Sequence, residues 1–270
     1  MSYLLLILAL LSSLSIALLL KVFEQKEQNR TVIIAANYIT AGTLGFLLSS
    51  KPQAEGLVIS FGIVVGLFFF VGFLLLSIAI KTKGVASSVT IGRLSLAIPV
   101  ALSIGLWGEK PLLIDIISLL LIFFIIISWE GKIGKVSPIL AAIFLAFGLL
   151  DSAMKFFKMN FPTMDDSFFL VIVFYSAMVW SWAYTLISRQ EIKGGDIAWG
   201  LILGVPNFFS SYFLLKALVL IPAYVTFPFI NIGIIITSAL AGHFLFKEEL
   251  NRKKILLILL GIIAVFFLSS

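Results

Sequence analysis

Long stretches of apolar residues follow one another along almost the whole chain, and this pattern limits the fold more than any other feature. Of the 270 residues, 61% are hydrophobic and 12% are charged, whereas soluble domains carry about 25% charged residues. A water-soluble protein of this size has too little interior to hide so much apolar surface. We therefore expect an all-α membrane protein with the lipid bilayer as its main partner.

Charged residues and Gly or Pro breaks divide the apolar stretches into separate segments. A helix that crosses the ~30 Å hydrocarbon core needs about 20 apolar residues, and the alternating pattern of barrel strands is missing. The sequence predicts about ten transmembrane helices, and we expect a multi-pass protein of the bacterial plasma (inner) membrane. The predicted spans are 2–22, 31–50, 56–80, 84–107, 111–129, 137–159, 166–188, 196–219, 222–246 and 251–269.

Parts of the second half repeat parts of the first at a distance of about 139 residues. The third predicted span opens with Gly62-Ile-Val-Val-Gly66, and the eighth opens with Gly200-Leu-Ile-Leu-Gly204. Glutamates also stand at matching places, at the ends of the fourth and ninth spans. Matches of this kind are harder to obtain by chance than matches of leucine, so they favour an internal repeat. We expect the Gly-xxx-Gly pairs to allow close helix packing.

The repeat divides the chain into residues 1–135 and 136–270, with five predicted spans in each half. Because five is odd, the second half must enter the membrane from the opposite side. Inverted repeats are typical of secondary transporters, whose halves rock around a site near the midplane. Lys and Arg favour the connections after odd-numbered spans, which predicts that both termini lie outside. The opposite side holds Lys51, Lys110, Lys155, Lys158 and Lys216.

The fourth span resembles a signature of the drug/metabolite transporter superfamily, EamA-like branch. Residues 84–109 carry small residues, Pro99 near mid-span and Glu109 at the end, and residues 223–248 form a second copy with Pro228. The ten-span, five-plus-five layout also resembles this family. The resemblance implies a central cavity between the halves and a secondary transporter, often an exporter, of small polar metabolites such as amino acids. Span 1 lacks the glutamate through which small multidrug members of the superfamily couple to protons.

Several function classes lack the residues they need. The chain has no cysteine and a single histidine, His243, so thiolate chemistry and a His cluster are excluded. No nucleotide-binding P-loop occurs, and we expect no cofactor, no metal site and no enzymatic activity. The net charge of +6 comes mostly from short loops, which indicates membrane anchoring rather than nucleic-acid binding. A homodimer is compatible with the sequence but does not follow from it.

Two charged residues stand deep inside predicted spans. Arg93 lies about 14 Å into span 4 and Asp151 about 21 Å into span 6 from the same side, at 1.5 Å per residue. Such residues cost roughly 2.5–3.5 kcal/mol on insertion, so they need a partner, a cavity or a function. We expect Arg93 to face an anionic or carboxylate-bearing substrate, with Asp151 as its counter-ion or as a proton-coupling acid. Lys155, four residues later on the same helical face, is a further binding or coupling candidate. The alternative is a structural pair, Arg93–Asp151 or Asp151–Lys155, that substrate never touches.

Prolines mark the other candidate positions. Pro206 should kink or break span 8 because proline removes a backbone donor, and Pro99 and Pro228 invite the same expectation. A backbone carbonyl that loses its hydrogen bond at a proline is tolerated within a span where it faces protein or a water-filled cavity. Asn207, Tyr212 and Asn231 are therefore candidate substrate-binding donors, unless the kinks serve packing alone.

Glu109 and Glu248 precede spans 5 and 10, and we expect them to cap those helices or to act as gates. Two alternatives to a coupled transporter stay open. One is an uncoupled, channel-like facilitator, and the other is an assembly subunit that moves no solute.

Overall fold

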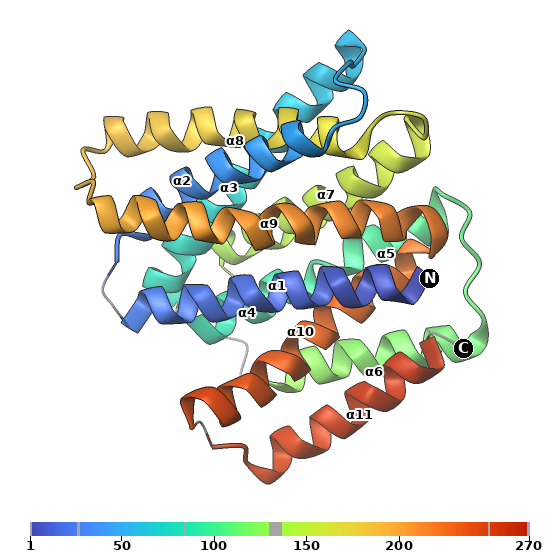
Figure 1. Cartoon of the computed structure of the whole chain (residues 1–270). Coiled ribbons are helices and arrows are strands. Elements are labelled where there is room, and N and C mark those ends of the chain that lie inside the picture. The colour runs from blue at the N-terminus through green and yellow to red at the C-terminus, as the bar shows by residue number, and fades with distance from the viewer. Residues whose placement is uncertain (1, 26–27, 84, 130–136, 248, 269–270) are drawn as a thin grey trace. The chain divides into compact units, whose positions relative to one another are not determined.

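The structure is a computed structural model that describes residues 2–25, 28–83, 85–129, 137–247 and 249–268. Within these ranges the chain is helical and holds no strand (Figure 1). The all-α prediction is therefore confirmed. The helices are α1 (Ser2–Gln25), α2 (Arg30–Leu48), α3 (Gly56–Lys83), α4 (Val85–Leu94), α5 (Ala97–Gly105), α6 (Leu113–Trp129), α7 (Pro138–Asn160), α8 (Asp166–Ile187), α9 (Gly194–Leu220), α10 (Ala223–Phe246) and α11 (Arg252–Leu268).

Eight segments of the described chain are long and apolar enough to cross a membrane. They are α1, α2, α3, α7, α8, α9, α10 and the segment Ser87–Gly105, which joins most of α4 to α5. The helices of predicted spans 5 and 10, α6 and α11, have 17 residues each. The predicted boundary between the two halves, at residues 135 and 136, and Glu248 lie outside the described residues.

Of the three prolines predicted to disturb a span, Pro99 accompanies a break in the helix. The fourth span is interrupted at Ser95–Leu96, between α4 and α5. Pro99 follows in the first turn of α5, where it has no N–H to donate to the Ser95 carbonyl. Helices α9 and α10, by contrast, run without interruption through Pro206 and Pro228. The helix is therefore not broken at either proline, and a kink at Pro206 or Pro228 stays a prediction.

The chain forms two compact units, and α3, α7 and α9 run from one unit into the other. Unit 1 comprises Met1–Val71 and Phe156–Ala217, and unit 2 comprises Gly72–Lys155 and Leu218–Ser270. Each unit combines helices from the beginning and the end of the sequence. The local chemistry of each is described separately below.

In unit 1, α2 and α8 pack along each other (Figure 1), and glycines bring the neighbouring helices close to this pair. A Cβ atom on Gly62 of α3 would come within 2.8 Å of Ile172 on α8. A Cβ atom on Gly204 of α9 would come within 2.6 Å of Thr40 on α2. Gly66 and Gly200 are equally crowded. The predicted role of the Gly-xxx-Gly pairs in close packing is confirmed.

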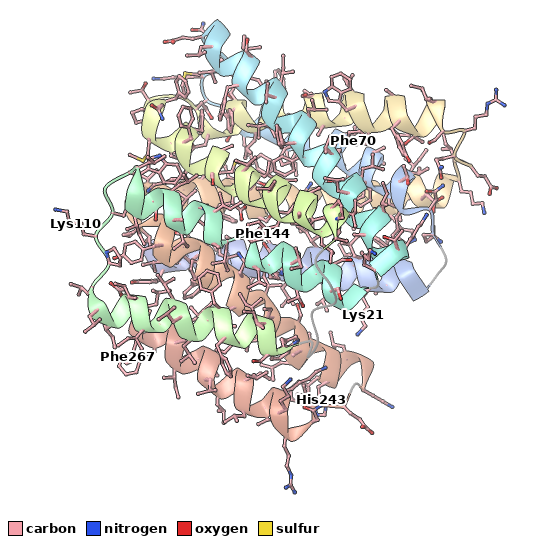
Figure 2. All side chains as sticks on the ribbon, turned by 180° about the vertical axis from the view of Figure 1, so that it is seen from behind. Lys21, Phe70, Lys110, Phe144, His243 and Phe267 are labelled. Carbon is pink, nitrogen blue, oxygen red and sulfur yellow. The ribbon has the colours of Figure 1, made fainter. Side chains whose placement is uncertain are left out.

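In unit 2, α10 packs against α5 and α11, and α6 lies beside α11 (Figure 1). A buried cluster joins α7 to α3 and α4 through Leu140, Ile143, Ala79 and Ile91. Phe144 of α7, labelled in Figure 2, packs against this cluster. Lys110, on the connection between α5 and α6, is exposed and projects away from the helices (Figure 2).

Candidate functional site

Arg93 lies at the C-terminal end of α4, directly before the break in the fourth span. A cation is favoured at a helix C-terminus by the helix dipole. Its Nη1 donates a hydrogen bond to Oδ1 of Asn231 on α10, at 3.2 Å. The Asn231 amide is itself oriented, because its Nδ2 donates to the Phe227 carbonyl at 3.0 Å. The oxygen of Asn231 is thereby turned toward the guanidinium.

Asp151 on α7 is the acid that acts on Arg93, since the charges of the two residues interact. Close contacts bring α7 against both parts of the fourth span, α4 through Gly92 and α5 through Ile98. A Cβ on Gly92 would meet Phe147 at 3.1 Å, and a Cβ on Gly148 would run into Ile98. Within the described chain, no group hydrogen-bonds the Asp151 carboxylate. Arg93 and Asp151 are therefore close enough for their charges to interact, but within the described chain they make no direct ion pair, and the Asp151 carboxylate is not held in place.

The three polar residues lie well inside their spans, and two of them are not fully buried. Asn231 is buried, whereas Arg93 and Asp151 are half-buried. Counted from the nearer end of its span, each residue is about 9–14 Å deep at 1.5 Å per residue. An ionisable residue at such a depth is costly and is usually tied to function. The arrangement can hold a charged or polar solute at the guanidinium.

Lys155 lies one turn beyond Asp151 on α7, but it has a different partner. Its Nζ forms an ion pair with Glu109 at 2.8 Å and donates to the Leu218 carbonyl at 3.4 Å. The alternative of an Asp151–Lys155 pair is therefore wrong. The sequence spacing placed both residues on one helical face, but it could not show that Glu109 reaches Lys155 from another segment.

Glu109 caps a helix, but not the one that follows it. Its carboxylate accepts hydrogen bonds from the backbone N–H groups of Ala223, at 2.8 Å, and Tyr224, at 3.2 Å, at the start of α10. The N–H of Leu112, before α6, is instead satisfied by Asp115 at 2.7 Å. The prediction that Glu109 caps span 5 is wrong. Burial opposes ionisation, yet the hydrogen bonds from Lys155 and α10 hold the pKa of Glu109 below its usual range.

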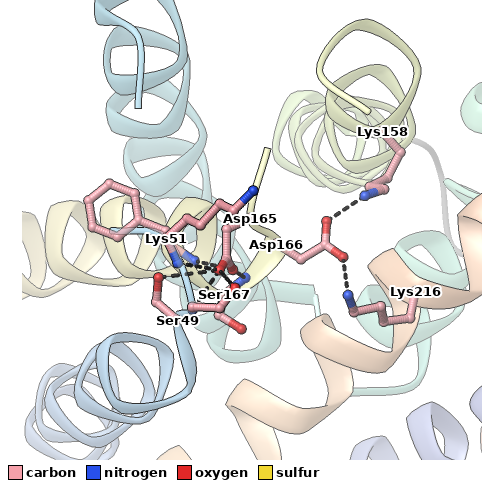
Figure 3. A network of polar contacts seen from close by, with 9 residues as sticks. Ser49, Lys51, Lys158, Asp165, Asp166, Ser167 and Lys216 are labelled. Atoms are coloured by element: carbon pink, nitrogen blue, oxygen red, sulfur yellow. Dashed lines mark hydrogen bonds and ion pairs between the residues drawn. The ribbon is translucent and has the colours of Figure 1, made fainter. Parts of the chain in front are cut away.

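Unit 1 contains a second polar cluster, centred on Asp166 at the start of α8 (Figure 3). Its carboxylate pairs with Lys158 at 2.5 Å and with Lys216 at 3.0 Å. Lys158 and Asp166 are nearly fully buried, whereas the Lys216 side chain is 43% exposed. Sequence reasoning missed this triad because it treated these residues as ordinary charges at the ends of spans. The eight-residue separation of Lys158 and Asp166 across a short turn was the available signal.

Asp165, next to this triad, ties α8 to the segment that follows α2. One carboxylate oxygen caps α8 by accepting from the Ser167 and Phe168 N–H groups, and the other accepts from the Ser50 and Lys51 N–H groups (Figure 3). Burial again opposes ionisation, but the hydrogen bonds from Ser50, Lys51 and Phe168 keep the pKa of Asp165 below its usual range.

Asn29 has a matching role at the other end of the α2–α8 pair. Its side-chain oxygen caps α2 by accepting from the Thr31 N–H. Its amide nitrogen donates to Gln190 at 3.3 Å and to the Glu191 carbonyl at 3.1 Å, in the segment that follows α8. Each helix of the pair is thus capped by a residue that also binds the segment after its partner.

The remaining sequence candidates, Asn207 and Tyr212, belong to unit 1. Asn207 Nδ2 donates to Asn37 Oδ1 at 2.5 Å. The ring of Tyr212 stacks on that of Phe208. The ammonium nitrogen of Lys216 lies over the Tyr212 ring, 5.4 Å from its centre. Of the six candidates, Arg93, Asp151 and Asn231 therefore form a joint polar site in unit 2. Lys155 pairs with Glu109 instead, and Asn207 and Tyr212 lie in unit 1. Among the described residues, no group of three His, Cys, Asp or Glu side chains is placed to hold a metal.

Comparison with known proteins shows similarity over nearly the whole chain. No family model matches the sequence. The chain is 26% identical over 288 residues to an uncharacterized protein of Haemophilus influenzae (strain ATCC 51907 / DSM 11121 / KW20 / Rd), covering 97% of this chain and 96% of that protein. A solved crystal structure matches with a TM-score of 0.81 at 14% identity, covering 99% of this chain and 96% of the other. The chain therefore has the fold of that crystallised protein.

Proposed function

We propose that the chain is a secondary transporter of small polar solutes, similar to the EamA-like drug/metabolite transporters. The observation that carries this proposal is the polar site of Arg93, Asn231 and Asp151 inside apolar spans. Ionisable residues at this depth cost several kcal/mol to insert and usually mark a substrate or ion pathway. A site for a passing solute needs such charges.

The helix pairings support the proposed inverted repeat. Among the described residues, α2 packs with α8, α6 with α11, and α5 with α10. These are predicted spans 2 and 7, 5 and 10, and 4 and 9, so each pair joins a helix to its counterpart in the other half. Helices related by a two-fold axis pack in this way when they lie next to the axis.

The polar site itself fits such an axis. Gly62 and Gly66 match Gly200 and Gly204 at an offset of 138 residues, and the same offset takes Arg93 to Asn231. A hydrogen bond between a residue and its own counterpart is expected where the axis passes between them. The break in the fourth span adjoins Arg93, and transporters with inverted repeats use broken helices near the midplane for binding.

Two further parts of the proposal concern the membrane. With 17 residues each, α6 and α11 lie at the lower end of the length that spans a bilayer, about 17–25 residues. Counting them gives ten spans in the proposed layout. We place the protein in a bacterial inner membrane, with alternating access of the two halves to the shared site.

The test is solute flux through purified protein in lipid vesicles. A panel of labelled amino acids, organic anions, sugars and polyamines would be measured with and without a pH gradient. We expect at least one solute to exceed its flux in empty vesicles, and Arg93→Gln to lower that flux at least about tenfold. Arg252→Gln removes the same charge from an exposed position in α11 and should keep wild-type flux.

Three results would count against the proposal. If no solute moves above the level of empty vesicles, the chain is an assembly subunit rather than a transporter. If Arg93→Gln transports the same solutes at the same rates, the polar site is structural. If flux never depends on a pH gradient, in wild type or in Asp151→Asn, the chain is an uncoupled facilitator with respect to protons.

A further inference from the structure

We propose that the site at Arg93 binds a monovalent organic anion together with a proton, the anion at the guanidinium and the proton on the Asp151 carboxylate. This inference rests on the proposed function, because it assumes that the site binds a solute. It adds the charge class of that solute and the ion that accompanies it.

The first step is that Asn231 positions Arg93 without neutralising it. A guanidinium is always charged and offers five N–H donors. Within the described chain, Arg93 uses Nη1 for a bond to the Asn231 oxygen, at 3.2 Å. An amide oxygen is a neutral acceptor, so the positive charge persists. The planar fork of an arginine matches a carboxylate, which it can bind through two parallel hydrogen bonds.

The second step is the charge balance around Asp151. Helix α4 contributes Arg93, and α5 contributes no titratable side chain. On α10, the neutral Asn231 contacts Arg93, whereas the titratable Tyr224 and His243 lie in its first and last turns, away from Asn231 along the helix. On α7 itself, Lys155 is neutralised by Glu109. In α3, the charged residues of the part within unit 2 lie at its exposed end, at Lys81 and Lys83. The net charge of the site is therefore zero when Asp151 is ionised and +1 when it is protonated.

The third step compares the two states in the presence of an anion. With Asp151 ionised, a bound anion brings the site to −1 and must compete with Asp151 for Arg93. With Asp151 protonated, the anion brings the site to zero. An uncompensated charge is costly in a medium of low dielectric constant, so anion and proton each strengthen the binding of the other. The proton comes from solution and returns to solution when the anion leaves, and no covalent bond of the anion changes.

The proposal predicts a quantitative pH dependence. If the anion binds only the protonated form, its apparent dissociation constant scales with the inverse of the protonated fraction. The affinity should then fall about tenfold for each pH unit above the pH at which Asp151 ionises. By the reciprocity of coupled binding, each anion bound above that pH should take up about one proton.

The experiment measures anion binding and proton uptake on the purified full-length protein in a weakly buffered detergent solution. The probes are lactate, gluconate and benzoate, with choline as a cation of similar size. Titration calorimetry gives the dissociation constant over a series of pH values, and a pH indicator dye gives the protons taken up. In wild type we expect at least one of the three anions to bind with proton uptake and choline to give no signal.

Three variants identify the residues. Asp151→Asn, which resembles the protonated acid, should bind the anion with an affinity that no longer depends on pH and without proton uptake. Arg93→Gln should lose anion binding at every pH. Glu55→Gln removes one negative charge from an exposed position before α3 and should behave as wild type. If Asp151→Asn keeps the wild-type pH dependence and proton uptake, or if anions bind without proton uptake, the inference is wrong.

The vesicle assay separates failure of this inference from failure of the proposed function. If neutral or cationic solutes are transported while none of the three anions binds or moves, the chain is a transporter but the inference is wrong. If no solute of any charge moves, the proposed function is wrong and the inference falls with it. Proton uptake that accompanies flux of an anion, and that Asp151→Asn abolishes, would support both.

Discussion

Replacing Asp166 with Asn should destabilise unit 1 strongly, because it removes the carboxylate that neutralises two lysines. Asp166 is 3% exposed, and the side chain of Lys158 is 6% exposed. Removing one partner of a buried ion pair typically costs about 3–5 kcal/mol, since the other charge is left uncompensated. Lys216 is 43% exposed and can turn toward solvent, so Lys158 should account for most of the loss. We expect Asp166→Asn to lower the unfolding free energy by about 3 kcal/mol.

The assay is reversible unfolding in mixed detergent micelles, followed by tryptophan fluorescence. Glu191 and Lys193 form a matched control, because they are paired at 3.3 Å but are 76% and 64% exposed. Glu191→Gln should change stability by at most about 1 kcal/mol. Adding Lys158→Met to Asp166→Asn should recover much of the loss, because no buried charge is then unpaired. The reasoning is refuted if Asp166→Asn costs no more than Glu191→Gln.

Three further predictions concern packing, hydrogen bonding and pH. Gly204→Leu should destabilise the protein by about 1–3 kcal/mol by forcing α9 away from α2, whereas Gly56→Leu, with no neighbour within 4 Å of its Cβ position, should be nearly neutral in the same unfolding assay. Asn37→Ala removes the hydrogen-bond partner of Asn207 and should lower the unfolding free energy by about 1–3 kcal/mol. In a double-mutant cycle, the variant that also carries Asn207→Ala should lose less stability than the two single variants added together. The pKa of Glu109 is lower in the folded than in the unfolded state. The stability that its carboxylate contributes should therefore be complete above about pH 4.5 and should be lost as the pH falls through the folded-state pKa. Glu109→Gln should already be less stable than wild type at neutral pH, and its unfolding free energy should fall less than that of wild type on acidification.

Features that depend on local pattern were predictable from the sequence. The apolar segments gave the helices because length and composition decide which segments lipid can accept. The Gly-xxx-Gly pairs predicted close helix contacts, because glycine has no Cβ and a neighbouring helix can approach its backbone closely. Arg93 and Asp151 were recognised because charges inside apolar runs are conspicuous.

Features that depend on long-range pairing were not predictable. Glu109 was expected to cap the helix that follows it, but it caps α10, more than a hundred residues later. Lys158 and Asp166 stand at the ends of their helices in the sequence, where charges are ordinary, and their burial follows from tertiary packing alone. A helix end or a buried charge can be paired with any suitable group that the fold brings close to it. The sequence therefore shows that a partner is required, but not which residue supplies it.

In the proposed repeat, packing follows the two-fold relation but charge does not. The glycine contacts of α3 on α8 recur as those of α9 on α2, and the caps Asn29 and Asp165 act alike. Asp151, in contrast, corresponds to a serine in the first span, Ser12 at an offset of 139 residues or Ser13 at an offset of 138, and Arg93 corresponds to the neutral Asn231. In the transporter that we propose, symmetric packing would let both halves make the same motion at equal energy, and two unlike charges near the proposed axis would fix one binding mode for the solute. A transporter that uses one site from both sides of the membrane needs both properties. Its two halves must be able to exchange conformations, while the site must bind the solute in the same way throughout.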